Sequence, residues 1–346
     1  MKIKNSVQSI SPDISIVLMC LALLVACPVR IFQMLKNIDS VTGFYTDFNS
    51  IMIYVLYGVL GVAALLILVL TFLSGRIPAA VPPNGRRIPL AAASFVFAAT
   101  LFYDAISTYF FQKEATATIV QNVKSASTLS HVHALCALLA SCYLVVFFIS
   151  YLSGNDYYKK LKILSLTPVL WAIIKVLERI TVIISIVRVS ELLLELFAFV
   201  FLMVFFMAFA RVASDVSSTG SMWSVISCGC IAALFILTYS IPRLMLTVTG
   251  NAESLVNGYP LVFADIGCVL FILVFVVTTL RKGYTVEDVE KMNAEIAMKQ
   301  EQDEKIQENV SNVKALTEEG AASDTINVKI AKVSAPEAVE EEENQE

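Results

Sequence analysis

The chain has 346 residues, of which 57% are hydrophobic and only 16% are charged, and its mean hydropathy is +0.75. Soluble globular domains are about 45–50% apolar and about 25% charged, so the composition excludes an ordinary soluble protein. The charge is uneven, because residues 281–346 carry 8 Lys/Arg against 17 Asp/Glu and residues 1–280 carry 17 against 12. We predict an all-α membrane protein with a slightly basic polytopic domain at residues 1–280 and an acidic tail.

Eight apolar windows are long enough to cross a bilayer, which requires about 20 residues in a helix. They lie at residues 14–35, 51–74, 88–111, 130–152, 163–184, 189–213, 221–246 and 259–280. We therefore expect about eight transmembrane helices. The fifth and sixth windows are joined by only the few residues 185–189. These two windows could instead form one re-entrant hairpin.

The first window begins like a lipoprotein signal peptide, with Lys2 and Lys4, an apolar run and then Leu24-Val25-Ala26-Cys27. The apolar pattern continues past Cys27 as far as Leu35, which favours a retained first helix. All seven cysteines lie inside apolar windows. Their placement indicates packing residues, with neither a disulfide framework nor a zinc site.

The loop after the first window contains Ile38-Asp39-x-x-Thr42-Gly43-Phe44-Tyr45. It resembles the first outer loop of a group of uncharacterised bacterial multi-pass membrane proteins. The resemblance implies an all-helical bacterial membrane protein and carries no activity with it. We expect the aromatic residues Phe44, Tyr45 and Phe48 to anchor the loop at the membrane interface, with a cap over a polar interior as the alternative.

The third window carries small residues on one helical face, namely Ala91, Ser94, Ala98 and Ala105. Small residues at this spacing let neighbouring helices approach closely. We interpret the stripe as a packing face.

The basic residues between the windows indicate the orientation. If both ends lie in the cytoplasm, eleven Lys/Arg fall on the cytoplasmic side and six, including Arg30 and Arg243, on the outer side. Cytoplasmic loops of membrane proteins carry the excess of Lys and Arg. We predict a multi-pass plasma-membrane protein with both termini in the cytoplasm.

Ionisable residues inside the windows are the strongest functional signal. A charge at the bilayer centre costs about 2.5–3.5 kcal/mol on insertion scales, so such residues usually face a bundle interior and mark a substrate or ion site. Most of them lie in the outer half of the predicted bundle. The candidates for binding a solute or ion are Asp104, Lys175, Glu178, Arg179, Glu191, Glu195, Arg243 and Asp265.

The fifth and sixth windows would form an antiparallel hairpin, in which residues at equal distance from the tip meet. Arg179 should therefore face Glu195 or Glu191, and Lys175 should be neutralised by Glu178 one helical turn away. We expect the cluster to open to the outside and to be sealed below by the apolar residues 199–206. Structural ion pairing between helices is the alternative to a functional role.

Asp104 and Asp265 have two simpler interpretations as well. Either carboxylate could pair with Arg243, or it could accept a hydrogen bond from a hydroxyl such as that of Ser107.

His131 and His133 open the fourth window. Residues at i and i+2 point about 200° apart on a helix, so a joint metal site is not expected. We predict interfacial histidines, with pH sensing as the alternative.

The tail begins with Thr285-Val-Glu-Asp288, a capping-box-like helix start. We predict a helical cytoplasmic segment at residues 281–318, whose part from 285 to 318 could bind a cytoplasmic protein. The acidic residues 319–346 have the composition of a disordered segment.

No nucleotide-binding, metalloprotease or serine-hydrolase motif occurs, and we expect no cofactor, no metal and no catalytic residue. The acidic soluble segment argues against nucleic-acid binding. The bilayer itself is the expected partner of the apolar surface. The favoured function is transport of a small solute or ion, in which an arginine binds an anionic group and a carboxylate carries a proton or cation. A membrane sensor or scaffold acting through the tail, and an intramembrane enzyme, are the alternatives.

Overall fold

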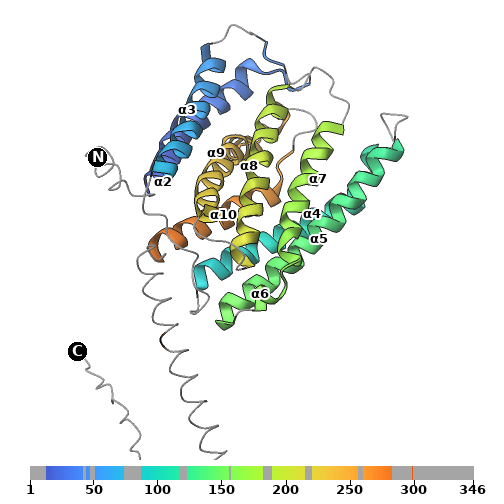
Figure 1. Ribbon diagram of the computed structural model, residues 1–346. Coiled ribbons are helices and arrows are strands. Elements are labelled where there is room, and N and C mark those ends of the chain that lie inside the picture. Colours follow the sequence, from blue (N-terminus) through green and yellow to red (C-terminus); the bar gives the residue numbers. More distant parts are fainter. Residues whose placement is uncertain are drawn as a thin grey trace, which may run out of the picture. The chain divides into compact units, whose positions relative to one another are not determined.

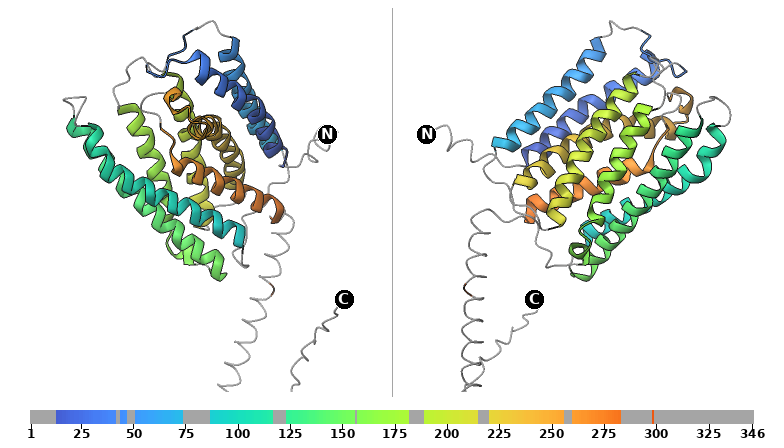
Figure 2. Two further views of the ribbon diagram at one scale, coloured as in Figure 1. Left: turned by 180° about the vertical axis from the view of Figure 1, so that it is seen from behind. Right: turned by 45° about the vertical axis from the view of Figure 1, so that its right-hand side comes forward.

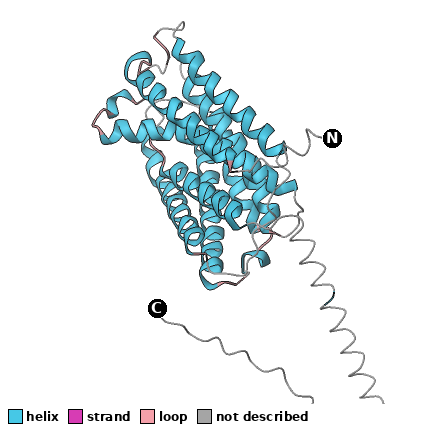
Figure 3. Cartoon of the chain, turned by 90° about the vertical axis from the view of Figure 1, so that its left-hand side faces the viewer, coloured by secondary structure: helices cyan, strands magenta, loops and turns pink. Residues whose placement is uncertain are grey.

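The computed structural model describes residues 13–41, 44–46, 51–73, 87–116, 123–155, 157–181, 189–214, 220–255, 260–282 and 298. Helices make up almost all of these ranges (Figure 3). Within the described residues, an isolated antiparallel β-bridge joins Ile38 to Tyr45. The chain divides into two units, Met1–Val289 and Glu290–Glu346. The predicted helical and disordered parts of the tail lie outside the described residues, apart from Arg281 and Lys282, which end a membrane helix, and Met298.

Seven helices are long and apolar enough to cross a membrane, which confirms a helical multi-pass protein and seven of the predicted windows. They are α2 (Ile14–Phe32) with its π-helical continuation η1 (Gln33–Asn37), α3 (Ile51–Leu73), α4 (Ile88–Thr116), α5 (Val123–Ser153), α8 (Val189–Ala213), α9 (Gly220–Val248) and α10 (Phe263–Lys282).

The fifth predicted window corresponds to a shorter helix, α7, which spans the 15 residues Thr167–Thr181. It contains three charged residues, Lys175, Glu178 and Arg179. Two short elements, α6 (Tyr157–Lys160) and η2 (Leu164–Leu166), connect α5 to α7, and η4 (Ala252–Ser254) follows α9.

Helix α9 lies at the centre of the bundle, in contact with α2, α3, α8 and α10 (Figures 1 and 2). In its most apolar stretch 83% of the residues are buried, whereas the corresponding value for α3 is 28%. Helix α4 packs against α5 and α10, and α7 lies between α5 and α8. Helix α3 therefore presents most of its surface to lipid, and α9 presents very little.

An aromatic core joins these helices below the charged residues. The ring of Phe97 on α4 lies 6.0 Å from Trp171 on α7, 6.1 Å from Phe206 on α8 and 5.7 Å from Phe271 on α10, measured between centroids. The predicted apolar seal at residues 199–206 is present, since Phe199, Phe205 and Phe206 are fully buried.

The small-residue stripe of α4 is a packing face, as predicted. Ala91, Ser94, Ala98 and Ala105 are all buried. The hydroxyl of Ser141 on α5 donates to the carbonyl of Ala98 at 2.9 Å, which requires the close approach that small residues allow.

Two of the helices contain a proline close to a buried arginine. Helix α2 continues past Cys27, with Pro28 inside it and a π-helical turn after it. Pro242 lies inside α9, next to Arg243. A proline removes one i→i−4 hydrogen bond, so each helix is irregular near its arginine. Pro168 lies in the first turn of α7, where proline is well tolerated, so it does not disturb that helix.

Gly267 on α10 lies in close contact with α4. A Cβ built at Gly267 would lie 2.2 Å from the Thr100 Oγ1 atom. Such overpacking costs about 1–3 kcal/mol. We expect Gly267→Ala to lower the melting temperature of the purified protein, measured by intrinsic fluorescence in detergent.

Gly61→Ala is the control, because a Cβ at Gly61 meets nothing within 4 Å. Adding Thr100→Ala to Gly267→Ala should restore part of the loss, since the closest atom is then removed. Equal melting temperatures for Gly267→Ala and Gly61→Ala would show that α4 and α10 do not pack as described.

Candidate functional site

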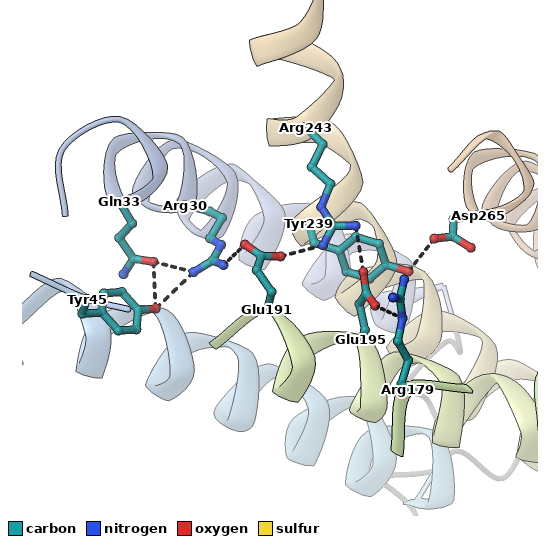
Figure 4. Close-up of polar contacts among 9 residues, drawn as sticks. All are labelled: Arg30, Gln33, Tyr45, Arg179, Glu191, Glu195, Tyr239, Arg243 and Asp265. Atoms are coloured by element: carbon teal, nitrogen blue, oxygen red, sulfur yellow. Dashed lines mark hydrogen bonds and ion pairs between the residues drawn. The ribbon is translucent and has the colours of Figure 1, made fainter. Parts of the chain in front are cut away.

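Two carboxylates in the first turns of α8 organise the charged residues at one end of the bundle. Glu191 forms ion pairs with Arg30 on α2 and, at 2.6 Å, with Arg243 on α9. Glu195 lies 2.8 Å from Arg243 and 2.6 Å from Arg179 on α7. Figure 4 shows the resulting alternating chain, Arg30–Glu191–Arg243–Glu195–Arg179, which we call the arginine network.

The loop after α2 and η1 closes over the Arg30 end of this network. Arg30 Nη1 donates to Gln33 Oε1 and to the Tyr45 hydroxyl, each at 3.1 Å. The bridge between Ile38 and Tyr45 holds the loop in place, and Gln33 Nε2 donates to the carbonyl of Met52 at 2.9 Å. Tyr45 is buried against Arg30 rather than exposed at a membrane interface, and Phe48 of the same loop lies outside the described residues.

A tyrosine extends the network to a third carboxylate. The Arg243 guanidinium lies 4.6 Å from the centre of the Tyr239 ring, and the Tyr239 hydroxyl donates to Asp265 Oδ2 at 3.0 Å (Figure 4). Arg30, Arg179 and Arg243 thus pair with the two glutamates, whereas Asp265 is bound by the Tyr239 hydroxyl.

A second cluster lies where α4, α5 and α7 meet. His133 Nε2 is 3.2 Å from Asp104 Oδ2, and His133 Nδ1 is 3.0 Å from Glu178 Oε2. The Lys175 ammonium lies 3.6 Å from Asp104 Oδ2 and 5.6 Å from the centre of the Trp171 ring. We call Asp104, His133, Lys175 and Glu178 the histidine cluster.

His133 is placed to hold a proton. A neutral imidazole donates through only one nitrogen, whereas both nitrogens of His133 face carboxylate oxygens. The Nδ1 contact with Glu178 is a hydrogen bond, whereas the Nε2 contact with Asp104 is a charge contact without hydrogen-bond geometry. The cluster has equal positive and negative charge only when it carries this one proton.

The predicted contact between Arg179 and Glu195 is confirmed. The predicted neutralisation of Lys175 by Glu178 is replaced by other pairs, since Lys175 lies beside Asp104 and Glu178 reaches His133. The reason is that α7 packs against α5, which brings His133 within reach of Glu178.

Neither Asp104 nor Asp265 is paired with Arg243, which instead binds the two glutamates of α8. The Ser107 hydroxyl donates to the backbone carbonyl of Asp104, at 3.0 Å, and not to its carboxylate. Both aspartates are nevertheless buried in the predicted polar region.

The two histidines diverge as predicted, but only one of them is interfacial. His131 is exposed, with its ring against that of Tyr109 at 5.5 Å. His133 is 3% exposed and belongs to the buried cluster.

Four residues of the site, Arg30, Gln33, Tyr45 and Tyr239, are not among those predicted from the sequence. For Arg30 a signal was present, because an arginine inside a 24-residue apolar span should be read as an intramembrane charge rather than as an outer-loop charge. The loop and tyrosine contacts carry no comparable sequence signal.

The expected outward opening is not present at the centre of the arginine network. Arg30, Glu191, Glu195 and Arg243 are each at most 1% exposed. Their charged groups contact one another, and the buried rings of α8 lie below them. The described residues therefore form a closed site.

The site offers charge recognition and proton exchange rather than metal binding. Among the described residues no group of three or more His, Cys, Asp or Glu side chains is arranged to hold a metal ion. The carboxylates face arginine, lysine, histidine or tyrosine. An arriving anion would compete for an arginine, and an arriving proton or cation would compete for a carboxylate.

No protein-family model, no curated protein and no solved structure matches the chain. The resemblance of the first outer loop to bacterial multi-pass proteins stays a prediction, and Thr42 and Gly43 of that motif lie outside the described residues.

The buried pairs predict a strong coupling between α2 and α8. Glu191→Ala leaves Arg30 and Arg243 without this partner, and breaking a buried pair costs about 3–5 kcal/mol. The double variant Arg30→Ala/Glu191→Ala should lose less stability than the sum of the two single variants, because one uncompensated charge is removed. Denaturation of the purified protein in mixed micelles measures this.

Glu253→Ala is the matched control, since Glu253 is exposed in η4. Strict additivity of Arg30→Ala and Glu191→Ala would contradict the pair.

Proposed function

We propose that the protein is a transporter of a small solute or ion and that the arginine network closes its outer end. The supporting observation is that Glu191 and Glu195, on one helix, pair with cations from three others, α2, α7 and α9. A solute that enters from this end must displace at least one of these pairs. Opening the network would free Arg243 for an anionic group and a glutamate for a proton or cation.

The histidine cluster is the proposed proton site. Asp104 and Glu178 hold His133 between them, and Lys175 lies beside Asp104. Loss of the proton leaves this cluster with one uncompensated negative charge. Because a buried uncompensated charge is costly, protonation would favour the closed arrangement of α4, α5 and α7. Proton release would then be coupled to their separation.

We further propose eight membrane crossings, with η2 and α7 forming the fifth. Together they contain 18 residues, from Leu164 to Thr181. At 1.5 Å per residue they reach about 27 Å, close to the thickness of about 30 Å of a hydrocarbon core.

Contacts at both ends of α8 support this fifth crossing. Ser165 lies 3.1 Å from Ser214, beyond the end of α8, and Arg179 lies 2.6 Å from Glu195, near its start. The charges of α7 face α4, α5 and α8, which reduces their exposure to lipid.

An even number of crossings puts both termini on the same side, which we assign to the cytoplasm of the plasma membrane. Arg30 and Arg243 are paired inside the bundle, so they no longer count as outer-loop charges. In this assignment the cytoplasmic side carries eleven Lys/Arg and the outer side carries four. This strengthens the assignment by the positive-inside rule.

Glu195→Gln should abolish transport while leaving the protein folded. Neutral glutamine cannot pair with Arg243 and Arg179 as a carboxylate does, so the network cannot cycle between its paired and open states. The measurement is charge movement in proteoliposomes under imposed proton and sodium gradients, with pooled small solutes. Wild-type current that disappears in Glu195→Gln is the expected result.

Glu253→Gln provides the control, because this exposed glutamate is not part of either cluster. His133→Gln should keep solute exchange and lose the response to a proton gradient. Silence of the folded wild-type protein, or equal currents in wild type and Glu195→Gln, would overturn the transport proposal. Such a result would favour a sensor or scaffold.

A further inference from the structure

We infer that a groove between α4 and α10, at the end of the bundle opposite the arginine network, binds an anionic phospholipid. The groove encloses about 510 Å³. Its lining consists of Arg87, Ile88, Pro89, Leu273, Val274, Val277, Thr278 and Arg281. Neither arginine belongs to the proposed transport site.

The lining has the polarity of a phospholipid along its length. Leu273, Val274 and Val277 form an apolar wall on α10, with Ile88 opposite them on α4. Ile88 is 68% exposed on a membrane-crossing helix, so the groove is accessible from the lipid side. This wall suits an acyl chain better than it suits a soluble metabolite.

The charges at the end of the groove specify the headgroup. Arg87 precedes the first residue of α4, and Arg281 lies in the last turn of α10. Two arginine residues line one cavity, and the described residues of its lining include no carboxylate. The Arg87 Nη1 atom is buried and has no hydrogen-bond partner among the described residues. A phosphate between the two arginines would supply a negative charge that balances them and a hydrogen-bond acceptor for Arg87 Nη1.

The position of the two arginines matches the depth of lipid phosphates. Arg87 and Arg281 mark the ends of apolar spans, Ile88–Phe110 and Phe263–Arg281. Basic pockets between transmembrane helices on the cytoplasmic side bind anionic headgroups, because that leaflet carries the anionic lipids. The N-terminus of α4 adds a favourable dipole at the same place.

The test compares phosphatidylglycerol with phosphatidylcholine of the same acyl chains, added to the full-length protein in neutral detergent. Native mass spectrometry measures the bound lipid. We expect phosphatidylglycerol to bind preferentially and Arg87→Gln or Arg281→Gln to weaken it about fivefold each, as expected for one basic contact. Arg211→Gln is the matched control, since Arg211 is exposed at the last turn of α8 and does not line the groove.

Val277→Trp tests the apolar wall separately, because it keeps both arginines and fills the groove. This variant should also lose the bound phosphatidylglycerol. Unchanged binding in Arg281→Gln and Val277→Trp would overturn the inference, as would equal binding of phosphatidylcholine by the wild type. Displacement of the lipid by millimolar inorganic phosphate would assign the arginines to free phosphate instead and would also overturn it.

Discussion

Two glutamates that lipid cannot solvate set the arrangement of the bundle. Glu191 and Glu195 lie one turn apart on α8, and each is 1% exposed. A buried carboxylate must find cationic partners, so α2, α7 and α9 all bring arginines to this one helix. Because the central helix α9 supplies Arg243 to both glutamates, the position of α8 against α9 determines where the other two helices can pack.

The charged end and the aromatic core have different physical roles. Rings such as Phe97, Trp171 and Phe206 fill the space between α4, α7 and α8, and their contacts restrict the orientation of the helices only weakly. The ion pairs are directional, and desolvation offsets much of their attraction, so they contribute more to specific pairing than to net stability. The ion pairs hold the helices together, and another charged group could replace one partner at a small net cost in free energy. Such pairs are suited to a protein that alternates between two conformations.

The membrane helices could be predicted from the sequence because a helix that crosses lipid needs an apolar run of defined length. Among the predicted spans, α7 departs from that pattern, with three charges in 15 residues. The contact between Arg179 and Glu195 followed from the antiparallel hairpin. Arg30 and Glu191 are 161 positions apart, and no periodicity relates them. The same limit explains His133, whose partners come from α4 and α7. Local geometry predicts pairs within a hairpin, whereas pairs between distant helices depend on the packing of the whole bundle.

The proposed closure of the outer end by Glu191 and Glu195 can be measured most directly with a cysteine at Ala198. This residue lies about one turn deeper than Glu195 on α8 and is fully buried. In a background whose native cysteines are replaced, the account predicts that Ala198→Cys resists a membrane-impermeant thiol reagent applied from outside. Adding Glu195→Gln should make labelling about tenfold faster or more, given the cost of about 3–5 kcal/mol for a broken buried pair. Equal labelling rates with and without Glu195→Gln would contradict the account.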